Sequence, residues 1–147
     1  MPRVERSALI AVPPGVAFAY VADPSNALRW MHGFSRFDPV EPGRSGVGAR
    51  VTATGSIFGI PLTTTLEIVE FDPPRRLVSR TTGRLKSHSV WEFAPTEAGT
   101  RVTFTGDYDV PGGLLRLMGG PLVERELEKN AETSLTNLKQ RLEERQA

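Results

Sequence analysis

The sequence lacks several residue types and patterns on which common protein chemistries depend. Its 147 residues include no cysteine, which excludes disulfide bonds, thiolate metal sites and a cysteine nucleophile. Only two histidines are present, His32 and His88, and neither belongs to an HExxH or comparable metal-binding spacing. The P-loop and nucleophile-elbow signatures are missing as well. We therefore expect no bound metal and no cofactor.

The chain also has little net charge and no long apolar run. Its 18 Lys and Arg residues nearly balance 17 Asp and Glu residues, and no basic tract appears, so we expect no nucleic-acid partner. No stretch is long and apolar enough for a transmembrane segment, and no secretory signal opens the chain. The length suits one core. These features predict a cytoplasmic protein with a single domain over residues 1–147.

One long helix is predicted at the C-terminal end, over residues 121–143. Leu127, Ala131, Ser134 and Leu138 recur at helical spacing and form one stripe, with charged residues on the other faces. Pro121 suits the first turn, where its missing N–H is not needed. The centre of the stripe is small, which favours either a close approach to a sheet or a space for a ligand.

The rest of the chain reads mainly as short strands separated by turns. The sequence predicts a strand at 3–12, short helices at 14–22 and 25–30, and strands at 35–40, 49–56, 62–71, 76–82, 87–94 and 101–110. The short connections predict antiparallel neighbours. The expected fold class is α+β, with a seven-stranded antiparallel sheet covered on one face by the long helix.

Several local sequences in this order resemble one known superfamily. They are PPGVAF at 13–18, Trp30, EFDPPRRL at 70–77, WEFAP at 91–95, GTRV at 99–102 and VPG at 110–112. Together they resemble the START-like, helix-grip (SRPBCC) superfamily and, within it, polyketide cyclase/dehydrase-type proteins. This resemblance implies a sheet curved around the C-terminal helix, with a largely apolar cavity between them.

The expected function follows from this cavity. We expect binding of a hydrophobic or aromatic small molecule, lipid-like or polyketide-like. The residues expected to line the cavity are Trp30, Phe34, Trp91, Phe93, Phe104, Tyr108, Met118, Leu127, Ala131 and Ser134. The alternative is a polyketide cyclase or aromatase in which His88, Arg80 or Tyr108 manages protons. A third reading is an accessory module whose long helix contacts a partner protein.

Strand register leaves the orientation of several polar residues open. Leu66 and Ile68 favour one face of their strand whereas Phe71 favours the other, which predicts a β-bulge or an ambiguous register. If Glu67 and Arg80 face inward, they form a buried pair of functional interest. If they face outward, which we favour, they form a weak surface pair.

The segment PGGLLRLMGGP at 111–121 is unusually apolar for a connection. Its glycines could permit the hinge motion of a lid at the cavity mouth, or its leucines could touch a membrane. It could also serve a homodimer interface or form the first turn of the long helix.

Overall fold

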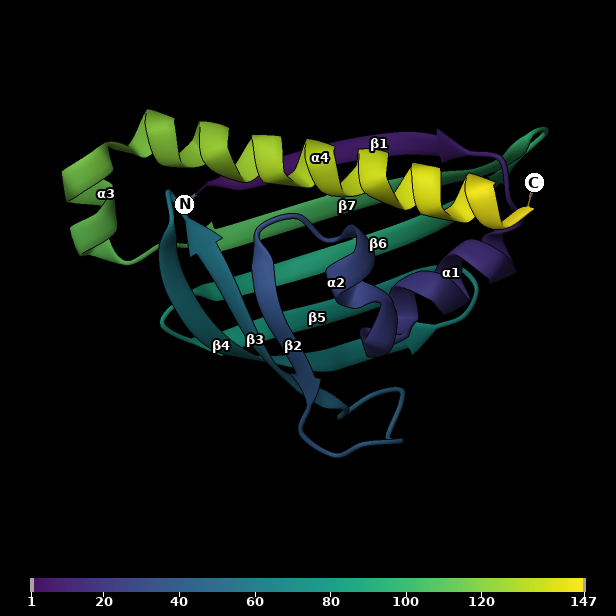
Figure 1. Cartoon of the computed structure of the whole chain (residues 1–147), viewed down its shortest axis with the longest axis horizontal. Coiled ribbons are helices and arrows are strands. Elements are labelled where there is room, and N and C mark those ends of the chain that lie inside the picture. Colours follow the sequence, from purple (N-terminus) through teal and green to yellow (C-terminus); the bar gives the residue numbers. More distant parts are fainter. Residues whose placement is uncertain (1, 147) are drawn as a thin grey trace.

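The computed structural model describes residues 2–146. Seven antiparallel strands form one sheet in the order β1-β7-β6-β5-β4-β3-β2, and the long helix α4 lies across its concave face (Figure 1). The strands are β1 Arg3–Ile10, β2 Phe34–Pro39, β3 Arg50–Ile57, β4 Ile60–Asp72, β5 Arg76–Gly83, β6 Lys86–Thr96 and β7 Gly99–Asp109. The helices are α1 Pro14–Ala22, the 3-10 turn η1 Pro24–Asn26, α2 Ala27–Trp30, α3 Gly112–Met118 and α4 Gly120–Gln146. This is the predicted helix-grip fold.

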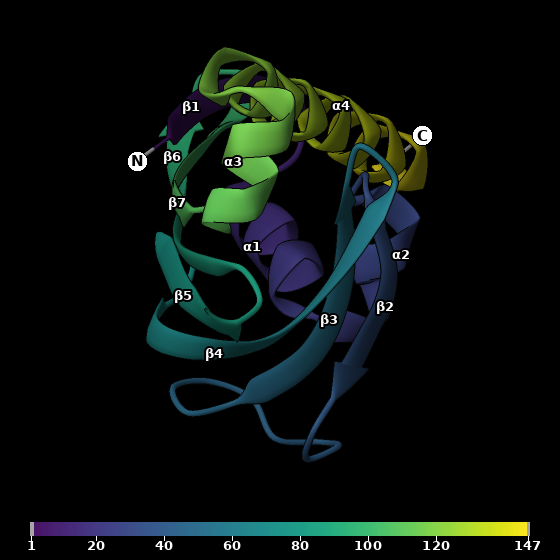
Figure 2. The same cartoon turned by 90° about the vertical axis from the view of Figure 1, so that its left-hand side faces the viewer.

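The sheet is strongly curled. Strands β4, β3 and β2 turn away from the plane of β5, β6 and β7 and form a second wall beneath α4 (Figure 2). The register between β4 and β5 shifts between Ile68 and Glu70, which confirms the predicted bulge, and a second shift between Phe34 and Arg36 bends β2. A bulge bends its strand and increases the local twist, so these two positions contribute to the curvature.

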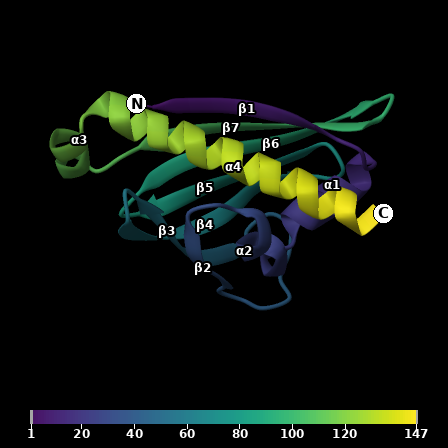
Figure 3. The ribbon, with the colours of Figure 1, turned by 45° about the horizontal axis from the view of Figure 1, so that its top comes forward.

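Helix α4 crosses the strands obliquely (Figure 3) and buries one continuous stripe against them. The buried members of the stripe are Val123, Leu127, Ala131, Ser134, Leu135, Leu138 and Leu142. The polar faces of the helix hold it at both flanks. On the β1 side, the Arg6 guanidinium pairs with Glu128 and, at 2.9 Å, with Glu132.

On the opposite flank, the Arg141 guanidinium donates to the Arg29 carbonyl of α2 at 3.3 Å, and three further bonds tie the middle of α4 to α2, to the α2–β2 connection and to the β3–β4 turn. The Asn137 amide donates to the Trp30 carbonyl at 3.2 Å, and the Ser134 hydroxyl accepts from the His32 backbone N–H at 2.8 Å. Near the start of the helix, the Glu126 carboxylate accepts from the Phe58 backbone N–H at 3.2 Å. We call these three bonds the rim bonds.

Aromatic side chains fill the space under one end of the sheet. The ring of Phe18 from α1 meets Phe71 and Phe93 edge-on, each with ring centroids 5.3 Å apart. The Trp30 ring meets Trp91 edge-on at the same centroid distance. Such edge-to-face pairs contribute packing and quadrupole attraction. These rings therefore pack closely together beneath α1, and a second pocket, lined by Phe18, Phe71 and parts of the α1–α2 and β2–β3 connections, adjoins them.

Most element boundaries differ by one to three residues from the sequence-based expectation, and two of the differences have a clear structural cause. Strand β1 ends at Ile10, because the chain turns there and the Thr100 hydroxyl donates to the Val12 carbonyl at 2.7 Å. The segment after β7 forms a separate short helix, α3, that ends at Gly119, where φ is 87°. Within residues 2–146, no helix combines the length and apolarity needed to cross a membrane.

Candidate ligand-binding pocket

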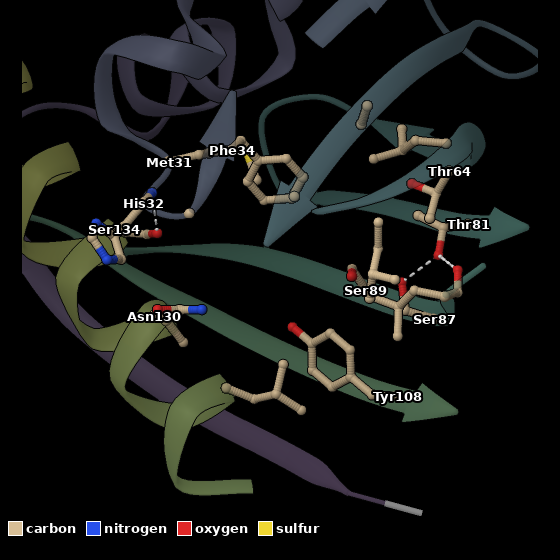
Figure 4. A pocket seen from close by; sticks show the side chains of 18 of the residues that line it. Met31, His32, Phe34, Thr64, Thr81, Ser87, Ser89, Tyr108, Asn130 and Ser134 are labelled. Carbon is tan, nitrogen blue, oxygen red and sulfur yellow. Dashed lines mark hydrogen bonds between the residues drawn. The ribbon is translucent and has the colours of Figure 1, made fainter. Parts of the chain in front are cut away.

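A pocket of about 140 Å³ lies between α4 and the sheet, toward the α3 end (Figure 4). Its walls come from the inner faces of β3 to β7, from the α2–β2 connection and from the middle of α4. A single water needs about one-tenth of this volume, so the space can hold more than one ordered water. The aromatic cluster beneath α1 reaches the pocket only through Trp91 among its described rings.

One side of the pocket is aromatic and aliphatic. Phe34, Trp91 and Phe104 line it together with aliphatic residues of β3, β4 and α4. The rings of Trp91 and Phe104 are 4.7 Å apart between centroids and are tilted by 45°. These two side chains face inward from adjacent strands because Trp91 and Phe104 are direct partners in the β6–β7 ladder. Apolar ligand surface could be buried against them.

The floor of the pocket carries a block of hydroxyl groups. Ser79 faces Ser89, and Thr81 faces Ser87, across the β5–β6 ladder. We call these four residues the hydroxyl floor. Thr81 donates to the Leu85 carbonyl at 2.9 Å, so its only hydroxyl proton is used, and Ser87 therefore donates to the Thr81 oxygen at 2.8 Å.

The remaining hydroxyls of this region are free within the described residues. Ser79, Ser89 and the neighbouring Thr64 of β4 make no side-chain hydrogen bond to another protein group. Ser79 is 6% exposed and Thr64 is 7% exposed. Their oxygens remain accessible from the pocket, because Trp30 Nε1 is the only fully buried side-chain nitrogen or oxygen without a partner among the described residues.

Tyr108 stands beside the hydroxyl floor on β7, and Figure 4 shows its phenol oxygen directed into the pocket. Its ring shares a space with Phe104 because Gly106, between them on the same face, has no side chain. A Cβ at Gly106 would lie 2.8 Å from Phe104 Cζ and 2.9 Å from Tyr108 Cε2. Burial, and secondarily the nearby Asp107 carboxylate, raise the pKa of Tyr108 to about 12.

Helix α4 contributes a wall of small and polar residues. Leu127, Asn130, Ala131 and Ser134 line the pocket from this side. Ala131 and Ser134 are short, so the helix leaves space where a leucine would close the contact with the sheet. The space exists because both facing surfaces, the helix and the hydroxyl floor, present small side chains.

Among residues 2–144, whose side chains the structure describes, no Asp, Glu, Lys or Arg lines the pocket. The two titratable residues that border it are Tyr108 and His32, and His32 is solvent-exposed beside Ser134 at the edge of the site (Figure 4). The described residues contain no group of three or more His, Asp or Glu side chains arranged to hold a metal ion. The pocket is therefore largely apolar, with hydroxyl and amide groups among its polar atoms.

The sequence matches the family described as "Polyketide cyclase / dehydrase and lipid transport" over residues 1–143. The chain belongs to this family. A comparison with curated proteins finds no match. The family assignment and the fold together suggest hydrophobic ligand binding or a polyketide cyclase role.

Solved structures show the same fold at low sequence identity. The protein TTHA0849 from Thermus thermophilus superposes with a TM-score of 0.84 at 24% identity, covering 99% of this chain and 100% of that one. The Zhui aromatase/cyclase from Streptomyces sp. R1128 superposes with a TM-score of 0.82 at 18% sequence identity, covering 99% of this chain and 95% of that one. Ara h 8.0201 superposes with a TM-score of 0.70 at 14% sequence identity, covering 95% of this chain and 96% of that one.

Seven of the ten residues expected to contact a ligand line the pocket of this family member. They are Phe34, Trp91, Phe104, Tyr108, Leu127, Ala131 and Ser134. The other three lie elsewhere. Trp30, the last residue of α2, packs against Trp91, and Phe93 packs against Phe18 in the aromatic cluster beneath α1. Met118 is the last residue of α3 and does not line the pocket.

Two of the three candidate proton-transfer residues lie outside the pocket. Arg80 and His88 are exposed on the outer face of the sheet, where they are direct partners in the β5–β6 ladder. Arg80 pairs there with Glu67 at 3.3 Å, so the outward orientation holds for this pair. Strand alternation is the reason, because the hydroxyl floor at positions 79, 81, 87 and 89 occupies the inner face. Tyr108 is the candidate that lines the pocket.

Sequence reasoning missed the hydroxyl floor and His32. Serine and threonine alternating with charged residues in a strand are usually read as surface positions, so positions 79–81 and 87–89 gave no clear signal. A signal did exist at Asn130, a polar residue beside the small centre of the helical stripe. The hydroxyl floor itself follows only from the register of β5 and β6, because the register decides which side chains of both strands face the pocket.

Proposed function

We propose that this chain, acting as one ligand-binding domain, binds a small hydrophobic or aromatic molecule in the pocket between α4 and the sheet. The observation that carries the proposal is the combination of an aromatic wall with small residues on both facing surfaces. Closing that space would have required only ordinary leucine or valine residues at positions such as Ala131 and Ser89. Burial of ligand surface against Trp91 and Phe104 supplies the affinity.

Native mass spectrometry of the purified protein tests this proposal directly. We expect a small-molecule adduct that disappears in a denatured control, or, if the ligand is lost on purification, saturable binding of an apolar fluorescent probe. A protein that carries no adduct and binds no apolar probe would contradict the proposal. The same spectrum counts subunits and so tests a homodimer formed through the exposed Leu117 of α3.

Filling the pocket from the helix side gives a sharper test. Ala131→Leu places a larger apolar side chain in the free space, so we expect probe affinity to fall about tenfold or more while the folded state is retained. Thr136→Leu is the matched control because Thr136 is exposed on the same helix and does not line the pocket. Isothermal titration of both variants measures the difference. Equal losses in the two variants would contradict a site at Ala131.

The alternative function is cyclisation of a reactive chain, and one observation favours it. The Tyr108 phenol lies in the pocket without a hydrogen-bond partner among the described residues and could polarise a substrate carbonyl. A cyclase would accelerate conversion of a reactive poly-β-ketone to cyclic product, as followed by mass spectrometry, and Tyr108→Phe would abolish that acceleration. A binder would retain the chain unchanged.

A further inference from the structure

The inner faces of β5 and β6 depart from the pattern expected beneath a covering helix. Strand residues that face a helix are normally apolar, and Leu77 and Trp91 at the α1 end follow this rule. The next two inward positions on each strand are the four members of the hydroxyl floor. Polar residues at core positions lower the stability of the folded state, because their groups lose hydrogen bonds to water. They therefore mark positions where function has been favoured over stability.

The hydrogen-bonding capacity of the floor is specific. The Thr81 and Ser87 hydroxyls spend their protons within the protein, whereas Ser79 and Ser89 keep both donor and acceptor capacity. The Tyr108 phenol and the Asn130 amide add further donors around the same space without protein partners in the described chain. A ligand with oxygen acceptors can satisfy these groups.

The electrostatic surroundings oppose a negative charge in the pocket. No Lys or Arg side chain of the described residues lines it, and His32 is solvent-exposed at its edge, so an anionic group placed beside the hydroxyl floor would be desolvated without an ion-pair partner. Tyr108 responds to these surroundings: burial and the Asp107 carboxylate raise the pKa of its phenol to about 12, because they disfavour the phenolate. A ligand carboxylate beside Tyr108 would face the same penalty.

We propose that the pocket selects neutral ligands that carry carbonyl or hydroxyl oxygens, with the oxygens on Ser79 and Ser89 and an apolar ring against Trp91 and Phe104. Fatty acids and other carboxylates are excluded as ligands. This inference rests on the proposed binding function, and it specifies the chemistry of that same site.

Three ligands with one ring system separate the possibilities. Naphthalene, 2-naphthol and 2-naphthoate share the same apolar rings. At pH 8, naphthalene has no polar group, 2-naphthol carries one neutral hydroxyl, and 2-naphthoate carries a negative carboxylate. Fluorescence titration of the full chain at this pH measures the three affinities. We expect 2-naphthol to bind at least about tenfold more tightly than 2-naphthoate, with naphthalene between them.

A double variant tests the assignment to the floor. Ser79→Ala with Ser89→Ala removes two free hydroxyls without breaking a hydrogen bond to the described part of the chain, so the fold is retained. We expect the preference for 2-naphthol over naphthalene to shrink about fivefold, while naphthalene affinity stays constant. Thr82→Val, which removes an exposed hydroxyl on the outer face of β5, should leave both affinities unchanged.

The outcomes distinguish the two levels of the proposal. If 2-naphthoate binds as tightly as 2-naphthol, or if the double variant leaves the 2-naphthol preference intact, the inference about ligand chemistry is overturned while the binding function stands. If none of the three ligands binds and no apolar probe binds, the binding function itself fails.

Discussion

Tyr108 is a residue whose surroundings make a measurable prediction about pH. Its pKa is raised from 10 to about 12 by burial and by Asp107, so the folded state keeps the phenol protonated when the unfolded state has lost its proton. The folded state then binds more protons between pH 10 and pH 12, and the free energy of unfolding falls as the pH rises through this interval. Denaturant unfolding at several pH values measures the slope.

Tyr108→Phe is the control for this effect. The variant has no phenol to ionise at this position, so its loss of stability between pH 10 and pH 12 should be smaller than that of the parent protein. Ultraviolet titration of the phenolate band should also show that one tyrosine fewer loses its proton at high pH in the variant. Identical slopes in the two proteins would show that Tyr108 does not carry the shift.

Residues at the site differ in how far the sequence could predict them. Trp91 and Phe104 were predictable because aromatic residues alternating with polar ones in a strand face the core. Ser79 and Ser89 were not, since a hydroxyl residue suits either face and only the ladder register decides. Arg80 and His88 illustrate the same limit, because a register shifted by one residue would have exchanged them with the hydroxyl floor.

At the scale of elements, the turn between β6 and β7 depends on one glycine. Gly99 has φ of 152°, and a Cβ there would lie 2.2 Å from the Ile10 carbonyl oxygen and 2.9 Å from Ala11 Cα. Both are backbone atoms that cannot rotate away. We expect Gly99→Ala to lower the free energy of unfolding by roughly 2–4 kcal/mol.

Gly15→Ala provides the comparison. Gly15 lies in α1 and an added Cβ would meet no atom within 4 Å, so alanine should leave stability unchanged or raise it by about 0.5–1 kcal/mol. Thermal or urea unfolding of both variants separates a steric effect from a general intolerance of substitution. A Gly99→Ala protein as stable as the parent would contradict the close approach of β1 to this turn.

Most helices and strands were predictable from the sequence, and the predictions that failed did so for physical reasons. Helix α4 and the seven strands follow from periodicity and turn residues, and the bulge in β4 follows from its change of parity at Ile68. Helix α3 was not anticipated as a separate element. The segment at 111–121 was expected to be a lid, an interface or the first turn of the long helix, whereas Leu114 is buried and anchors one helical stretch before Gly119 ends it.

At the scale of the whole molecule, the aromatic cluster around Phe18 and the pocket wall around Phe34 lie at opposite ends of the sheet, which predicts different costs for aromatic substitutions. Phe18→Ala removes a buried ring with two edge-on partners, so we expect a loss of roughly 3–5 kcal/mol in the free energy of unfolding. Phe34→Ala at the pocket wall should cost less, because that ring is only partly buried, but it should weaken probe binding. Equilibrium unfolding and probe titration of both variants check this contrast.

The reverse pattern would assign ligand binding to the other end of the molecule. If Phe18→Ala weakened probe affinity more than Phe34→Ala at temperatures where both variants remain folded, the pocket described above would not be the binding site.

The rim bonds have a consequence for the rate at which a bound molecule leaves. Two of them, at Glu126 and Ser134, are eight residues apart on α4, or about 12 Å, and the Asn130 side chain between them makes no hydrogen bond within the described chain. Opening this interval breaks few bonds and leaves the helix anchored to β1 through Arg6. We therefore expect substitutions at the rim bonds to change mainly the rate at which a ligand leaves. Substitutions at Trp91, Phe104 or the hydroxyl floor should change mainly its equilibrium affinity.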